Sequence, residues 1–432
     1  MQRVLAADAH RPTVGGRYLH WDKLRFFKTP DRITLEEWWA AIKLARRSQY
    51  RFLPLLDTRG DWFRLAMPDV LQRQVSEIDR DLSGRVKLPE ELTNSDTRDR
   101  YIVSALIEEA ITSSQLEGAA TTSVVAREML RSKRKPRDKG ERMIYNNFAA
   151  MQFVREVQGR ELTPDLVCDI HRRVTADTLD DEADAGRVRQ ANDIRVLDPV
   201  GLLLHSPPDA AELGVRLQAL CDFANEKTPN YYLHPAVRAA VLHLWLGYDH
   251  PFVDGNGRTA RALFYWSMLH SGYWMCEFVS ISHILRKAPA KYARAYLYTE
   301  TDENDATYFV LYQLDVLQRG IVALHEYVRA KADTIHKTRL VLRQSQSFNH
   351  RQLALLGHAL RNPSAKYTVS SHSTSHQVTR QTARVDLTEL TEHGFLNATK
   401  VGKEMAYTVP GDIEKRLEAF GARTVLNKGK TR

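Results

Sequence analysis

The sequence predicts a mainly α-helical protein in which one β-hairpin interrupts the central helices and a second short hairpin follows in the C-terminal region. Apolar residues recur at intervals of three and four along most of the 432-residue chain, which places them on one face of a helix. Two β-prone runs, Ile194–Leu197 and Leu202–His205, flank the turn sequence Asp198-Pro199-Val200-Gly201. Apolar residues make up 43% of the chain and charged residues 27%, as in ordinary globular proteins, and the length suffices for two or three domains.

The first region, residues 1–96, is expected to form a helical domain. The segments LEEWWAAIKLARRSQYRFLPL and MPDVLQRQVSEIDRDL carry apolar residues at helical spacing, and Pro54, Gly60 and Pro68 interrupt the runs. The pair Trp38 and Trp39 is assigned to core packing rather than to binding, because large aromatic side chains are usually buried.

The second region, residues 97–333, contains a polar, glycine-rich loop between two apolar helical runs, in HLWLGYDHPFVDGNGRTARALFYWSML. Gly255 and Gly257 allow the backbone to turn with positive φ and to approach a ligand closely. Their amides, together with those at the start of the next helix, would bind an anion. Arg258 and Arg261 are three apart on that helix, so both guanidinium groups can reach one phosphate chain.

The same loop supplies an acid and a base. Asp254 is a hard carboxylate of the kind that holds Mg²⁺ together with phosphates. His250 stands at the start of the loop, and a histidine, with an ordinary pKa of about 6.5, can take a proton from an attacking hydroxyl. In a simple connector the Asp-Gly and Asn-Gly pairs would be turn residues only, but a connector needs one glycine rather than this whole set. The segment therefore predicts a nucleotide-binding active site.

This segment resembles the signature of the Fic family, H-x-F-x-D/E-G-N-G-R-x-x-R, and every specified position matches. The likeness extends over about Asp99 to Leu317. Ala260 stands where many members have glycine, and Lys291 replaces the tyrosine often found beside the one that Tyr292 resembles. The resemblance implies that His250 is the base, Phe252 a packing anchor and Asp254 the metal ligand. It implies that the α- and β-phosphates are held by Gly255, Asn256 and Gly257. It also implies that the triphosphate is bound by Arg258 and Arg261, and that Tyr292 lies on the nucleotide side.

The family resemblance also implies an activity and a mode of target binding. Members transfer AMP from ATP, with Mg²⁺, to a hydroxyl of a Ser, Thr or Tyr in a target protein, and the protein itself is among the candidate targets. UTP or GTP would suit the same phosphate grip. The predicted hairpin is similar to the family's flap, which aligns the target segment by strand addition; its candidate docking residues are Ile194, Arg195, Val196, Leu203, Leu204 and His205.

A second motif, Ser113-x-x-x-Glu117-Gly118, resembles the family's inhibitory motif S/T-x-x-x-E-G/N. The resemblance implies that Glu117 pairs with Arg261 and prevents productive placement of the γ-phosphate, since one carboxylate competes with a phosphate for the same guanidinium group. A capping box from Ser114 to Glu117 would start a helix here, whereas Glu117-Gly118 fits a helix end. The periodic run before the motif favours the end.

The same glutamate leaves a second reaction open. In some relatives it positions water for removal of AMP from a modified protein, and one sequence does not separate addition from removal.

The third region, residues 334–432, contains two helical segments and a hairpin. HRQLALLGHALRNP is expected to end at Pro363 and VTRQTARVDLTELTEHGFLN at Gly394, and KVGKEMAYTV alternates like paired strands. This pattern resembles a winged helix-turn-helix, with Thr379 as the cap of the recognition helix. Its candidate DNA contacts are Arg380, Gln381 and Arg384, and its wing would be Thr399–Thr408 with Lys400 and Lys403.

The winged-helix resemblance supports an alternative from a different class, a DNA-binding regulator that uses the central region as a nucleotide sensor. Winged helices also dock proteins and form dimers, so DNA, a target protein and a second copy of the chain are all candidate partners. A net charge of +9 favours anionic partners in general.

Other classes of site and location are not expected. The chain has no G-x-x-x-x-G-K-S/T phosphate loop and no G-x-G-x-x-G after a strand. His372 and His376 are four apart but lack a third zinc ligand, and the three cysteines suggest no disulfide framework. The absence of a long apolar run and of an apolar N-terminal core predicts a cytoplasmic protein without a membrane partner.

Overall fold

The computed structural model describes residues 9–82, 95–197, 201–344, 348–362, 365–401, 404–413, 415–417 and 419–420. Helices dominate it, as predicted, and its sheets are small. The chain divides into two compact units, one of Met1–Lys87 with Ile102–Val322 and one of Leu88–Tyr101 with Ala323–Arg432. The finer division into three regions, at 1–96, 97–333 and 334–432, stays a prediction.

The N-terminal segment of the first unit combines helices with a hairpin that the sequence analysis missed. Leu53 and Leu55 are buried at alternate positions of one strand, so the local period is two rather than that of a helix. Gly60, with a φ of 85°, lies in the turn between the strands. The elements are α2 (Trp21–Leu24), α3 (Leu35–Arg47), β1 (Arg51–Leu56), β2 (Trp62–Leu65) and α4 (Asp69–Leu82), and β1 and β2 pair antiparallel.

The next helices have the boundaries that their capping residues favour. Thr163 Oγ1 accepts a hydrogen bond from Leu166 N at 3.2 Å, and Pro164 occupies the first helical position, as the sequence suggests. The helices are α6 (Ser95–Leu116), α7 (Ser123–Ser132), α8 (Lys139–Val157), α9 (Pro164–Thr175) and α10 (Leu213–Ala224), with the 3₁₀ turns η1 (Glu182–Asp184) and η2 (Ala210–Glu212).

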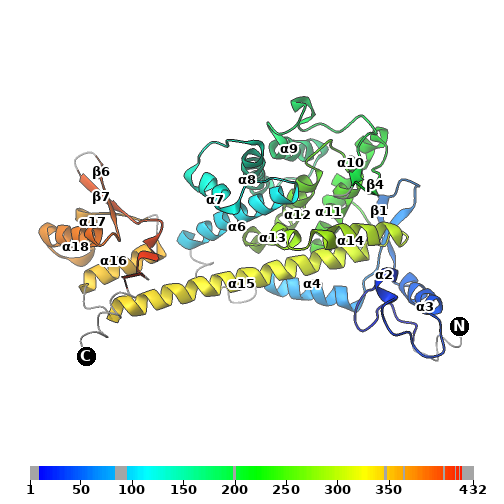
Figure 1. The fold of residues 1–432 in the computed structure, drawn as a ribbon, viewed down its shortest axis with the longest axis horizontal. Helices are drawn as coiled ribbons and strands as arrows, with labels where there is room; N and C mark the ends of the chain where they lie inside the picture. The colour runs from blue at the N-terminus through cyan, green and yellow to red at the C-terminus, as the bar shows by residue number, and fades with distance from the viewer. Residues whose placement is uncertain are drawn as a thin grey trace. The chain divides into compact units, whose positions relative to one another are not determined.

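Two helices form the centre of the first unit (Figure 1). α11 (Pro235–Asp249) and α12 (Asn256–His270) pack on each other and are buried along almost their whole lengths, including Trp245 and Trp266. α8, α9 and α10 cover this pair. The short loop between two fully packed helices is therefore fixed at both ends. The remaining elements are η3 (Trp274–Phe278), α13 (Ile281–Arg286), α14 (Pro289–Thr301) and α15 (Thr307–Gln344).

The expected central hairpin is present as two short antiparallel strands, β3 (Val196–Leu197) and β4 (Leu203–His205). Val196 pairs with His205 and Leu197 with Leu203. Ile194 and Arg195 precede β3, and the predicted turn residues 198–200 lie outside the described residues. We call residues 194–197 with 201–205 the flap. The flap exposes Leu197, Leu202 and Leu203.

The described part of the second unit includes the C-terminal part of α15, the short helices α16, α17 and α18, and a three-stranded antiparallel sheet of order β5-β7-β6. Thr379 caps α18 through a hydrogen bond from Thr382 N, as expected. Pro363 and Lys403 lie outside the described residues. The elements are α16 (His350–Arg361), β5 (Lys366–Thr368), α17 (Val369–His376), α18 (Arg380–Glu392), β6 (Asn397–Val401) and β7 (Glu404–Thr408), around a core that includes Leu356, Leu387, Leu390 and Phe395.

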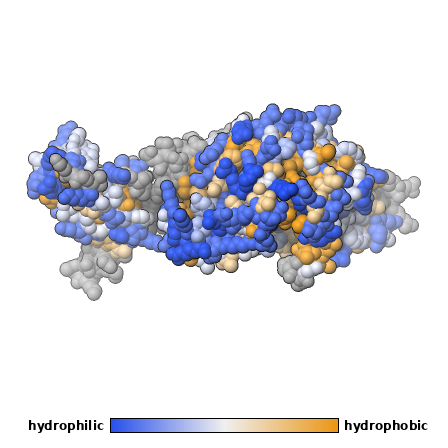
Figure 2. Space-filling model, turned by 90° about the horizontal axis from the view of Figure 1, so that it is seen from above, coloured by the Kyte–Doolittle hydropathy of each residue, from blue (hydrophilic) through white to orange (hydrophobic). Residues whose placement is uncertain are grey.

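Across the described residues, no helix is both long and apolar enough to cross a membrane. The face shown in Figure 2 is largely polar, with patches where apolar side chains gather.

Candidate active site

The predicted loop begins and ends with residues in left-handed backbone conformations. His250 has a φ of 46° and ends α11, where its N–H donates to Leu246 O at 3.0 Å. Gly255 has a φ of 81° and precedes the first residue of α12. The N–H groups in the first turn of a helix have no partner inside the helix. The start of α12 thus presents amides and the positive end of a helix dipole toward the loop.

The side chain of Asn256 bridges the loop through two hydrogen bonds to the backbone of Phe252. Its Oδ1 accepts from Phe252 N at 2.9 Å, and its Nδ2 donates to Phe252 O at 2.7 Å. Phe252 is fully buried and stacks on His171, with ring centroids 3.7 Å apart. Both ends of the Asn256 amide are thus engaged within the loop. Any contact of Asn256 with a phosphate would come from its backbone N–H.

The ring of His250 is held in the state that a base requires. Its Nδ1 lies 3.2 Å from Gly247 O, and a carbonyl can only accept, so Nδ1 carries a hydrogen and the lone pair of the neutral ring is on Nε2. Burial lowers the pKa of His250 below its usual range, and the neighbouring His205 and Arg189 act in the same direction. The residue is therefore an unprotonated acceptor near neutral pH.

The two arginines of the loop take different directions. Arg261 donates to Ser113 Oγ at 2.8 Å and to Glu117 Oε1 at 2.8 Å. Arg258 reaches Val174 O at 3.1 Å and Asp254 Oδ2 at 3.4 Å. Both side chains are buried and contact different partners. That both can reach one phosphate chain stays a prediction.

Asp254 is the candidate metal ligand. Its Oδ1 accepts from Gly255 N at 2.5 Å, and its side chain is 53% exposed. No group of three His, Cys, Asp or Glu able to hold a metal occurs within the described ranges. A single half-exposed carboxylate fits Mg²⁺ that takes its other ligands from phosphates and water, and does not fit a cage made by the protein alone.

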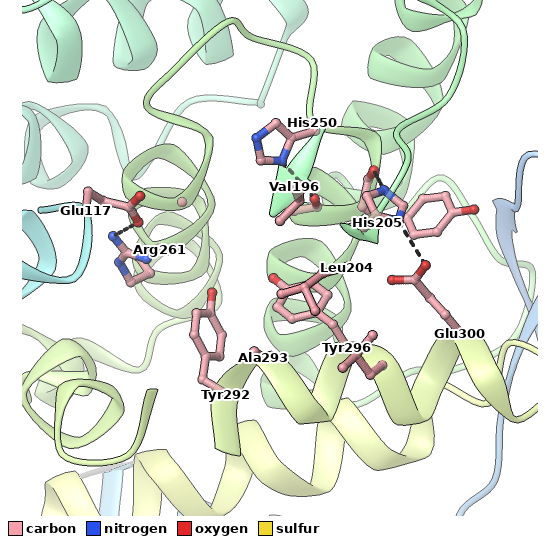
Figure 3. A pocket seen from close by; sticks show the side chains of 14 residues that line it. Glu117, Val196, Leu204, His205, His250, Arg261, Tyr292, Ala293, Tyr296 and Glu300 are labelled. Carbon is pink, nitrogen blue, oxygen red and sulfur yellow. Dashed lines mark hydrogen bonds and ion pairs between the residues drawn. The ribbon is translucent and has the colours of Figure 1, made fainter. Parts of the chain in front are cut away.

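A cavity of about 220 Å³ opens beside the loop (Figure 3). His250, Gly257 and Arg261 line it, whereas Arg258 and Asp254 do not. A side chain at Gly257 would overlap Glu117 Oε1, so only glycine fits there while Glu117 is in place. The other lining residues come from the flap, α11 and α14: Val196, Leu204, His205, Gly247, Tyr248, Tyr292, Ala293, Tyr296, Leu297 and Glu300, with Glu117 at the rim.

A second hollow of about 570 Å³ contains Asp254 and Lys139 on its walls. Glu117 borders both hollows.

The Ser113-x-x-x-Glu117-Gly118 segment forms the end of a helix rather than a start. α6 ends at Leu116, Gly118 has a φ of 91°, and Ala119 N donates to Ser114 O at 3.0 Å. This ending brings Ser113 and Glu117 together on Arg261. The ion pair that the resemblance implies is present.

Several residues of the site escaped the sequence analysis. His243 Nε2 lies 2.7 Å from the hydroxyl of Tyr292, and burial lowers the pKa of His243 to about 3, so its ring is neutral. His243 lies seven residues before His250 along α11, and this helical spacing could have indicated that both side chains lie near the site. Tyr296 packs against Gly247 of α11 so closely that a Cβ on Gly247 would overlap the hydroxyl of Tyr296. No local sequence pattern predicts this contact.

Of the remaining sequence candidates, Tyr292 and the flap residues Val196, Leu204 and His205 line the cavity. Leu203 is exposed, and Ile194 and Arg195 are not among the lining residues. Arg380, Gln381 and Arg384 lie on α18, in the second unit.

Comparison with known proteins agrees with this geometry. Residues 161–268 match the Fic/DOC family. The chain is 30% identical over 216 residues to a protein adenylyltransferase Fic of Nematostella vectensis, covering 48% of each chain. It is 34% identical over 126 residues to a protein adenylyltransferase Fic of Drosophila willistoni, covering 29% of this chain and 23% of that protein. The chain thus spans about half, or less, of the length of these relatives.

A similar fold occurs in a Fic family protein from Desulfovibrio desulfuricans G20. The TM-score is 0.52 at 18% sequence identity, and the match covers 80% of this chain and 97% of that one. With the family match and the loop geometry taken together, the chain carries a domain of the Fic/DOC family within residues 161–268.

Proposed function

We propose that this protein transfers AMP from ATP to a Ser, Thr or Tyr hydroxyl of a target protein. The observation that carries the proposal is the cavity in which an unprotonated His250, the first turn of α12 and Arg261 face one another. The similarity to proteins named adenylyltransferase supports the same reaction class.

In the proposed reaction, Nε2 of His250 takes the proton of the target hydroxyl as its oxygen attacks the α-phosphorus of ATP. The bond from the α-phosphorus to the bridging oxygen breaks, and pyrophosphate leaves. The α12 amides, Gly257 N–H and Arg261 face the phosphate oxygens on which charge develops. Mg²⁺ held by Asp254 and the phosphates would neutralise the leaving group.

We further propose that Glu117 inhibits this reaction in the resting protein. Its carboxylate occupies one donor of Arg261 and overlaps the space above Gly257. A γ-phosphate would need that same donor and space. The side chain of Glu117 is 28% exposed, so it can leave without disturbing the core.

The experiment is mass spectrometry of lysate proteins after incubation of the Glu117→Gly variant with ATP and Mg²⁺. Proteins should gain the mass of one AMP faster than with the parent protein, and Glu117→Gln should give the same increase if the charge is responsible. The gain should vanish in the double variant with His250→Ala. No AMP-modified protein in any sample, from folded variants, would refute the proposed transfer.

The flap is the proposed docking element for the target segment. Its exposed apolar side chains and the outer edge of a two-stranded sheet suit an extended peptide. A separate incubation tests removal of AMP. A purified modified target that loses AMP with the parent protein, and not with Glu117→Gly, would assign Glu117 to hydrolysis instead.

For the second unit we propose a winged helix, on the basis of its element order and its three-stranded sheet. Arg380, Gln381 and Arg384 are exposed at the N-terminal end of α18, where a recognition helix meets bases. A mobility shift of DNA that weakens with added salt would support DNA binding. Without it, the unit would serve to recruit targets or a second copy.

A further inference from the structure

The two ends of the flap meet at one buried arginine. Arg189 is 5% exposed, and its side chain donates from Nη1 to Ala191 O at 2.8 Å and from Nη2 to Pro208 O at 2.6 Å. Ala191 precedes the first flap strand and Pro208 follows the second. We call residues 189–192 and 208–210 the legs of the flap. The guanidinium group of Arg189 thus joins the two legs.

Asn192 adds a second link between the legs. Its Oδ1 accepts from Ala210 N at 2.8 Å, and Nη1 of Arg189 lies 3.4 Å from the same oxygen. The side chain of Asn192 is exposed, whereas Arg189 is buried. Two side chains of the first leg therefore bind the backbone of the second.

The same guanidinium group also holds the backbone of the base. Nε of Arg189 donates to His250 O at 3.0 Å, and the backbone N of Arg189 donates to Pro251 O at 2.9 Å. The N–H of His250 and its ring are held from within α11, by Leu246 O and Gly247 O. The carbonyl of His250 is held by a leg of the flap instead.

An arginine suits this place because its donors lie on three nitrogens of one rigid plane, and its three carbonyl partners belong to separate segments. A lysine has a single nitrogen and cannot reach all of them. The charge is favourable too, since the end of α11 presents unpaired carbonyls, and Asp193 and Asp209 add negative charge nearby. Arginine stays protonated in proteins, so this contact does not vary with pH.

We propose that Arg189 is a positioning residue that, with Asn192, fixes the flap to the backbone of His250. A target segment paired with the flap would then hold its hydroxyl at a set distance from Nε2 of the base. This kinetic consequence rests on the proposed function. The attachment of the flap is independent of any activity.

Hydrogen exchange of the full-length protein, followed by mass spectrometry, measures this attachment directly. Peptides from the flap should exchange about tenfold faster or more in Arg189→Met, because bonds from a charged donor are lost. Peptides from α12 should keep the parent rate. Arg189→Lys should resemble Arg189→Met. Flap exchange at the parent rate in either folded variant would overturn the proposal, and in Arg189→Lys it would mean that a positive charge alone suffices.

The matched control is Arg238→Met. Arg238 is 4% exposed and donates to Phe223 O, and to Thr228 O at 2.9 Å, at the start of α11. It is thus a second buried arginine bound to backbone carbonyls, away from the flap. Arg238→Met should leave flap exchange unchanged. Equal acceleration in Arg238→Met and Arg189→Met would show a general loosening of the unit and would overturn the proposal.

The kinetic test measures AMP transfer to lysate proteins and binding of ATP, both in the Glu117→Gly background. Arg189→Met should slow transfer about 10- to 100-fold, as expected when reacting groups are misplaced. Isothermal titration should give an ATP affinity within about twofold of the background, because the α12 amides and Arg261 are unchanged. A parallel loss of ATP affinity would mean that Arg189 supports the nucleotide loop rather than the target, and would overturn the proposal.

If tryptophan fluorescence shows that neither Arg189 variant folds, Asn192→Ala takes their place, because the side chain of Asn192 is exposed. Loss of its bond to Ala210 N should speed exchange in the flap, and an unchanged rate would overturn the proposal. Absence of AMP transfer in every sample, Glu117→Gly included, would refute the proposed function. The exchange result would still decide how the flap is attached.

Discussion

His250 combines a backbone role with a chemical one. Its left-handed conformation ends α11 and turns the chain into the loop, and the carbonyl of Gly247, one turn back, fixes the tautomer of its ring. The sequence predicts the base, because the surrounding motif is dense in phosphate- and metal-seeking residues. It does not predict the tautomer or the shift in pKa, since both depend on packing around the ring.

The pH dependence of AMP transfer should follow this shift. A base acts when unprotonated, and burial holds the pKa of His250 below the ordinary histidine value of 6.5. The pH at which the rate is half its maximum should therefore lie below 6.5. The charge of Glu117 raises the pKa of His250, so removal of Glu117 should move the acidic limb of the pH–rate profile to still lower pH.

The measurement is the initial rate of AMP transfer by the Glu117→Gly variant from pH 5 to pH 8, with circular dichroism at each pH as the control for folding. A rate already halved at pH 6.5 or above, in folded protein, would show that His250 titrates like an exposed histidine.

At the scale of elements, local sequence patterns predicted the turns, helix ends and strands that neighbouring residues determine. Local patterns account for the loop from His250 to Gly255, the Thr163-Pro164 helix start, the Glu117-Gly118 helix end and the strands of the flap. The contacts of His205 with Tyr248 and Glu300 join residues 43 and 95 positions apart. No periodicity encodes such pairs.

The β1–β2 hairpin is a local structure that the sequence pattern nevertheless did not predict. Its apolar residues follow directly on those of α3, so the run reads as one helix until the burial of alternate residues is seen. Local propensity alone does not decide where a helix ends and a strand begins in such a run.

The packing of α14 on α11 gives a prediction at this scale. Gly247 lies inside α11, and a Cβ there would overlap the hydroxyl of Tyr296. Gly247→Ala should push Tyr296 into the cavity and weaken ATP binding by about tenfold or more, corresponding to about 1.4 kcal/mol. Alanine is the better helix former by up to about 1 kcal/mol, which opposes any loss of stability from the clash.

Isothermal titration with ATP in the Glu117→Gly background measures the effect. Gly214→Ala in α10 is the matched control, because nothing lies within 4 Å of a Cβ at that position. Equal ATP affinity in both alanine variants would mean that Tyr296 moves aside at no cost.

At the scale of the molecule, the two compact units can be followed separately. All seven tryptophans lie between Trp21 and Trp274, and thus in the first unit. Tryptophan fluorescence therefore reports the unfolding of the unit that carries the active site. This allows its stability to be measured while the second unit remains attached.

The first unit should lose stability as the pH falls from 7 to 5. Burial lowers the pKa of His171 to about 4 and that of His243 to about 3, whereas in the unfolded chain both groups regain a value of about 6.5. The unfolded state therefore binds more protons in this window, and the free energy of unfolding rises with pH. Each histidine contributes up to about 1.4 kcal/mol per pH unit below its unfolded pKa.

Urea unfolding followed by tryptophan fluorescence at pH 7, 6 and 5, without nucleotide, tests this expectation. His171→Gln should lower the stability at pH 7, because His171 Nδ1 accepts from Gly186 N at 2.9 Å and Nε2 lies 2.8 Å from Asp254 O. It should also make the stability less dependent on pH, since one buried neutral base has been removed. The exposed His270→Gln should keep the slope of the parent protein, because its ring lies at the surface. An equal slope in His171→Gln would mean that His171 can be protonated in the folded state without loss of the loop that it supports.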